Sequence, residues 1–176
     1  FIGYRSGINN SSGNSNIGIG SQRNPPLSAN PITGAFNIMI GHANGESISS
    51  GSRNSFLGIE AGRYNTMGSS NTFLGDAAGT MNATGSNNIS IGAIGPANGS
   101  NNIVMGAGSG RNCSGNANVL IGNICASNLT TGKENTFIGR VELPTTAATE
   151  FSAGANTERT IILSNGADGQ SQKLYI

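Results

Sequence analysis

A five-residue motif, Asn-x-Φ-Φ-Gly with Φ an apolar residue, recurs along the chain and constrains its fold more than any other feature. The glycine, preceded by Ile, Leu or Met, stands at Gly3, Gly20, Gly41, Gly58, Gly75, Gly92, Gly106, Gly122 and Gly139. The steps between these glycines are 17, 21, 17, 17, 17, 14, 16 and 17 residues. An asparagine stands four residues before eight of them: Asn16, Asn37, Asn54, Asn71, Asn88, Asn102, Asn118 and Asn135. A period of this length is typical of stacked repeats.

The composition favours a solenoid over a conventional globular domain. Glycine accounts for 28 of the 176 residues, aromatic residues for 5%, and tryptophan is absent, so few large side chains are available to fill a globular core. The interior of a solenoid needs only about two or three side chains per coil. The sequence therefore predicts an all-β fold, a parallel β-solenoid (β-roll) of about nine coils with a 17-residue period.

The motif stops after Gly139, which predicts a domain boundary near residue 143. Residues 1–143 are expected to form the solenoid shaft or head. Residues 144–176 are expected to form a non-repeat β neck or cap before a further C-terminal domain, with strands at 160–164 and from residue 173. Because the chain starts at Phe1 in mid-repeat, we expect it to be a piece of a longer protein.

Each motif predicts a short strand that is apolar on both faces. The residue directly before the glycine is apolar in every coil, and the residue before that is apolar in six of the eight asparagine-bearing coils. These six residues form an apolar stripe: Met39, Phe56, Phe73, Val104, Leu120 and Phe137. Successive strand residues point to opposite faces, so we expect a homotrimer in which one face packs in the chain's own interior and the other against sister chains. A stripe enclosed within one chain would contradict subunit packing through the stripe and, with it, the fibre interpretation.

The asparagines and glycines of the motif are assigned structural roles. Stacked amides can hydrogen-bond from coil to coil at the inter-strand spacing of about 4.8 Å, forming a ladder, and asparagine tolerates the left-handed conformation of a coil corner. A glycine after the strand allows a tight corner with positive φ. The functional alternative for the asparagines is a row of ligand-binding amides.

Groups that could carry catalysis are sparse. His42 is the only histidine, so a metal site or a Ser-His pair would depend on one residue. The carboxylates lack the paired spacing of a glycosidase, no glycine motif continues as Gly-Lys-Ser/Thr, and two aspartates are too few for a calcium-binding nonapeptide roll. We expect a non-enzymatic protein with no metal site and no cofactor.

The charge distribution, hydropathy and cysteine positions limit which partners and covalent links the chain is expected to have. Nine basic and eight acidic residues are scattered along the chain and give a net charge of +1, which indicates no nucleic-acid partner. No apolar run in residues 1–176 approaches the length of a membrane span, and none of them has the pattern of a signal peptide, so no membrane insertion is expected. Cys113 and Cys125 stand at different phases of neighbouring coils, which favours two free thiols over a disulfide.

One coil carries an insertion that predicts an exposed loop. Residues 21–36 lengthen this coil and hold three of the five prolines. Insertions in solenoids often bind partners, although a tolerated insertion without function is an equal alternative. Large side chains in turns are the other candidates for contact with a receptor. The alternative is that they are solvated turn residues without a binding role. The candidate receptor contacts are Arg23, Asn24, Arg63 and Tyr64.

Residues 54–62, 71–79 and 135–139 resemble the repeats of viral and bacteriophage tail-fibre proteins and are similar to the head repeats of trimeric autotransporter adhesins. The likeness covers about residues 1–143. It implies a parallel β-roll, three chains around a common axis and binding to a host surface. The chain departs from adhesin heads in its 17-residue period and in placing the asparagine four rather than five residues before the glycine, which favours the fibre family.

The sequence therefore favours a structural and receptor-binding fibre segment of a virus or bacteriophage, located on the virion surface and mediating attachment to a host glycan or protein. A bacterial trimeric adhesin head, located on the bacterial cell surface, is one alternative, which a signal peptide and membrane anchor in the full gene would support. A trimeric tailspike-type polysaccharide depolymerase is another, which would need a groove with clustered acidic side chains.

Overall fold

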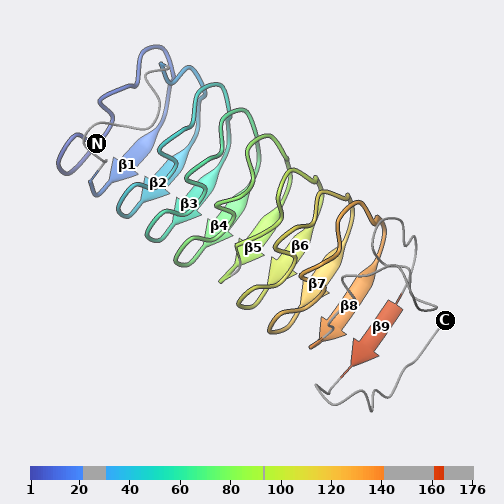
Figure 1. The fold of residues 1–176 in the computed structure, drawn as a ribbon. Helices are drawn as coiled ribbons and strands as arrows, with labels where there is room; N and C mark the ends of the chain where they lie inside the picture. The colour runs from blue at the N-terminus through green and yellow to red at the C-terminus, as the bar shows by residue number, and fades with distance from the viewer. Residues whose placement is uncertain (22–30, 93, 141–160, 165–176) are drawn as a thin grey trace.

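The chain winds as a parallel β-solenoid with one short strand in each coil (Figure 1). The computed structural model describes residues 1–21, 31–92 and 94–140, and the backbone of residues 161–164. The strands are β1 (Ile17–Ile19), β2 (Ile38–Ile40), β3 (Ser55–Leu57), β4 (Thr72–Leu74), β5 (Ile89–Ile91), β6 (Ile103–Met105), β7 (Val119–Ile121), β8 (Thr136–Gly139) and β9 (Ile161–Ser164). These described residues contain no helix. The predicted all-β solenoid is therefore confirmed.

The strands form one sheet in sequence order, each parallel to the next. About seven turns separate β1 from β8, and Ile2 extends the sheet on the N-terminal side by a parallel bridge to Ile19. The strand expected at 160–164 is present as β9, which continues the same sheet beside β8. The boundary near residue 143 and the strand expected from residue 173 lie outside the described residues.

Each strand is only three or four residues long because turn conformations border it on both sides. The residue before each motif asparagine has a positive φ: Ser15, Phe36, Arg53, Ser70, Asn87, Asn101, Ala117 and Glu134. The expectation that the motif asparagine itself takes the left-handed conformation is wrong by one position. The asparagine side chain points inward and hydrogen-bonds to the asparagines of neighbouring coils. Its predecessor turns the corner instead.

The glycine after the strand is required by close backbone stacking as well as by its φ in five coils: those of Gly20, Gly41, Gly58, Gly106 and Gly122. Gly41 has φ 140°, and a Cβ at this position would collide with the carbonyl oxygen of Gly58 in the next coil. Gly58 stands in the same relation to Gly75. A side chain at these corners would push neighbouring coils apart, which explains why the glycine repeats with the coil.

The apolar stripe lies inside the solenoid of a single chain. Met39 is 5% exposed, and the other five side chains of the stripe are fully buried. The rings of Phe56 and Phe73 stack with their centroids 5.0 Å apart. The expectation that this stripe packs between subunits is therefore wrong, because the middle residue of each strand points into the chain's own interior. The fibre interpretation loses the support of the stripe, and any contact between copies would have to use the other face of the strands.

Candidate functional site

The motif asparagines form a continuous buried ladder. The backbone N–H and the Nδ2 of Asn54 both donate to Oδ1 of Asn37, at 3.0 and 3.1 Å, and the same Nδ2 donates to the Gly68 carbonyl at 2.8 Å. The pattern persists across the short 14-residue coil, where Asn102 donates to Asn88. Seven of these asparagines, from Asn37 to Asn135, are at most 1% exposed. Their amides are engaged within the solenoid, which argues against a row of ligand-binding amides.

A second ladder, built from serine hydroxyls, was not predicted from the sequence. The N–H of Ser52 donates to Oγ of Ser69, and the N–H of Ser69 donates to Oγ of Ser86, at 3.1 and 3.0 Å. Ser100 and Asn116 continue the column. Its signal was available, because a serine stands two residues before the motif asparagine in four consecutive coils. These hydroxyls replace backbone acceptors that the short strands do not supply.

The outer face of the sheet, defined as the first and third residue of each strand from β1 to β8, carries a row of exposed apolar side chains in the part of the chain that the structure describes. Parallel sheets are normally covered on both faces. Eight apolar side chains of the outer face are 37–48% exposed: Ile17, Ile19, Ile38, Leu57, Leu74, Ile89, Ile103 and Ile138. Five more are partly exposed: Ile40, Ile91, Met105, Val119 and Ile121. Burial alternates along every one of these strands, so apolar residues face both the interior and solvent.

Arg63 and Tyr64, predicted as receptor contacts, differ in their environment. Arg63 Nε lies 3.2 Å from Oε2 of Glu46 in the preceding coil, and its Nη1 lies 2.9 Å from Oε1 of Glu60. Burial by itself lowers the pKa of Arg63, but the hydrogen bond and charge of Glu60, with the charge of Glu46, outweigh it and raise the pKa. The guanidinium covers one side of the Tyr64 ring at 5.1 Å.

Only one of these two residues is therefore placed to meet a partner. Arg63 is 9% exposed and links two coils through Glu46, whereas Tyr64 is 44% exposed. Arg23 and Asn24 lie outside the described residues. The structure thus reassigns Arg63 from a contact to an internal cation that holds Tyr64 in place.

The two cysteines are free and buried, as predicted. Burial raises the pKa of the Cys113 thiol to about 11, so the thiol stays protonated and unreactive at neutral pH. His42 is exposed, and its Nδ1 forms a 2.7 Å hydrogen bond with the Ser21 hydroxyl. Within the described ranges, no three His, Cys, Asp or Glu side chains gather closely enough to hold a metal ion.

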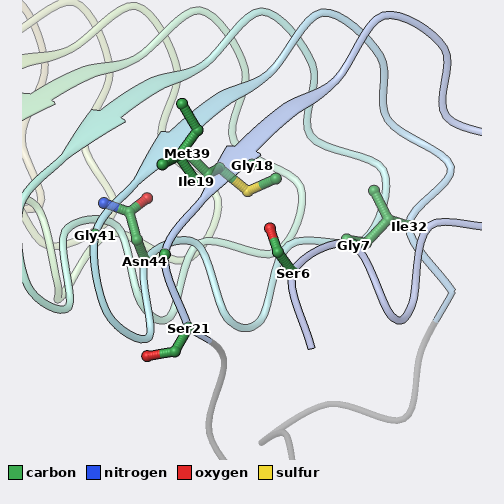
Figure 2. A pocket seen from close by; sticks show the side chains of 10 residues that line it. Ser6, Gly7, Gly18, Ile19, Ser21, Ile32, Met39, Gly41 and Asn44 are labelled. Carbon is green, nitrogen blue, oxygen red and sulfur yellow. The ribbon is translucent and has the colours of Figure 1, made fainter. Parts of the chain in front are cut away.

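A small cavity lies near the N-terminal end of the solenoid (Figure 2). It arises where the inner position of β1 is Gly18, beside the side chain of Met39, and Ser6, Ile32 and Asn44 also line it. Its volume of about 10 Å³ is close to the minimum for one water molecule. The cavity is a packing defect of the first coil and has no room for a substrate.

Comparison with protein-family models, curated proteins and solved structures finds no match for this chain. No helix in the part of the chain that the structure describes is long and apolar enough to cross a membrane. The outer face of the sheet is therefore the candidate functional site, and its geometry is the basis for assigning a role.

Proposed function

We propose that this chain is a structural fibre segment of a virus or bacteriophage that assembles as a homotrimer through the outer face of its sheet and supports attachment to a host surface. The observation that carries the proposal is the apolar outer face, which runs along all strands from β1 to β8. Soluble monomers rarely expose a continuous apolar surface of this extent.

The size of the outer face suits association with copies of the same chain. Thirteen apolar side chains on eight strands provide several hundred Å², which is the order of the roughly 800 Å² that one partner contributes to a stable interface. A partner that covers the whole face must be as long as the solenoid and match its inter-strand repeat of about 4.8 Å. A second and third copy of the chain meet both conditions.

The two ladders support the role of a stiff spacer. Each coil from β1 to β8 is tied to the next by backbone and amide hydrogen bonds, and the coils between Ala35 and Ser100 also by serine hydroxyls, so bending would break bonds in several columns at once. Repeat proteins of this kind gain length by adding coils without changing their interior. For contact with a host glycan or protein, Tyr64 is the candidate among the described residues, because its ring is both exposed and fixed by Arg63.

The experiment that tests the assembly places a charge on the outer face. We expect Leu74→Lys combined with Ile89→Lys to convert a trimer into single chains in sedimentation velocity, with an unchanged β-sheet circular dichroism spectrum. The matched control, Met67→Lys combined with Met81→Lys, puts the same charges on exposed residues outside the strands of the outer face and should leave the trimer intact. Equal sedimentation of wild type and the outer-face variant would reject the proposal.

A further inference from the structure

Phe36 combines two locally unfavourable features. Its φ is 61°, a left-handed conformation that is a genuine outlier for a bulky residue, and its side chain is 57% exposed. The corresponding positions in the adjacent described coils carry Ser15 and Arg53. An aromatic residue at this position stabilises neither the local backbone nor the interior of the chain.

The solenoid itself imposes this conformation, so Phe36 cannot relax out of it. Its N–H donates to the carbonyl of Asn14 in the preceding coil at 2.9 Å, and the N–H of Arg53 makes the matching bond to Ala35. Ser70 repeats the bond with Ser52. Every coil turns its corner in the same way, and a residue that prefers φ above zero, such as asparagine or glycine, would fit best.

Ile124, another bulky residue with positive φ, packs against the preceding coil. Its Cγ1 lies 3.6 Å from where a Cβ of Gly108 would stand, so its side chain covers the glycine of the preceding coil. Phe36 belongs to neither of the two buried apolar clusters. Residues held in such strained backbone conformations cluster at functional sites.

Phe36 lies at the rim of the outer face. Phe36 is exposed and turns the corner two residues before Ile38, the exposed first residue of β2. Ile38 pairs in register with the exposed Ile17 of β1. An exposed aromatic residue therefore stands next to the start of β2, where the outer face begins.

We propose that Phe36 is the anchor residue of the contact between copies of this chain. The inference rests on the self-association proposed above and names a residue on which the contact depends. An aromatic side chain at the edge of an apolar face can reach across to a neighbouring copy and bury a large area at low entropic cost. The second copy is the favoured occupant because Phe36 stands next to the surface that this copy would cover.

The test compares fold stability and self-association in Phe36→Asn, Phe36→Gly and Ser70→Asn. Replacing Phe36 by asparagine should raise the melting temperature measured below the association concentration, because the left-handed strain is relieved. The same change should weaken association by at least tenfold in sedimentation equilibrium, and glycine should act likewise. Ser70→Asn relieves strain in the same column without removing a ring, so it should leave association unchanged.

The outcomes separate this inference from the one on which it rests. A wild-type chain that is monomeric at every concentration would overturn both. A wild-type oligomer whose affinity is the same in Phe36→Asn would overturn the anchor role alone. An equal loss of affinity in Ser70→Asn would show that the corner conformation, rather than the ring, governs the contact, and would also overturn it.

Discussion

Asn54 donates both its backbone N–H and its side-chain Nδ2 to a single oxygen, Oδ1 of Asn37 in the preceding coil. Asn71 makes the same pair of bonds to Oδ1 of Asn54, so each buried amide serves two neighbours. This relationship explains why the asparagine recurs with the coil. The ladder closes the strand entrance, where the backbone has just left its corner conformation.

Replacing Asn54 by alanine should destabilise the solenoid by about 3 kcal/mol, because both buried donors of Asn71 lose their acceptor, and the Asn37 oxygen and the Gly68 carbonyl each lose the Nδ2 donor. Chemical denaturation measures the loss. Asn112→Ala is the matched control, since Asn112 is exposed and lies outside the ladder, and it should change stability by less than about 0.5 kcal/mol. Similar losses in both variants would contradict the role of the ladder.

Adjacent residues on opposite faces of β4 should respond differently to truncation. Phe73 is fully buried and stacked on Phe56, so Phe73→Ala should cost about 3–5 kcal/mol in the folding of the single chain. Leu74 is 41% exposed, and Leu74→Ala should mainly weaken association. Denaturation under dilute conditions, paired with sedimentation at high concentration, separates the two effects. A Leu74 variant that unfolds as readily as the Phe73 variant would argue against the assigned faces.

The Glu46–Arg63 pair predicts non-additive effects. Arg63→Met alone should cost about 3–5 kcal/mol because it leaves the buried Glu46 carboxylate without its cation. The double variant Glu46→Leu with Arg63→Met should recover most of that loss, since the unpaired charge is gone. Thermal melting of the four proteins of this cycle provides the measurement, and simple additivity of the two single changes would exclude a coupled pair.

The Cys113 thiol predicts a loss of stability at alkaline pH. Its pKa is raised from 9.0 to about 11 in the folded chain, so between these values the unfolded state releases a proton that the folded state keeps. The stabilisation is complete below pH 9 and is lost as pH rises toward 11, by up to about 2–3 kcal/mol. The difference between wild type and Cys113→Ala should show this slope. A difference that does not change with pH would contradict the shift.

Much of the fold can be predicted from the sequence because two residue types, asparagine and glycine, recur once in each coil. The spacing of asparagine and glycine fixes where each strand begins and ends, and the alternation of apolar residues predicts two apolar faces. It does not reveal which face is internal, because Phe73 and Leu74 are equally suited to burial. The structure resolves this through the corner before Asn71, which turns the middle strand residue inward.

The roles of Arg63 and Phe36 could not be predicted from the sequence. Arg63 resembled a surface contact because arginine in a turn is normally solvated, and its partner Glu46 stands 17 residues earlier, a separation that matters only once the coils are stacked. The sequence pattern assigns Phe36 to the inserted loop, residues 21–36. The role proposed for Phe36 depends on its positive φ, and the pattern of apolar and polar residues does not predict a backbone angle.

The mass of the wild-type chain in solution, measured by multi-angle light scattering over a range of concentrations, tests the central claim most directly. The account predicts about 53 kDa, three times the chain mass of 17.7 kDa, because three copies cover one another's outer face. A mass of one chain at every concentration, with Ile38, Leu57 and Ile89 left open to solvent, would contradict it.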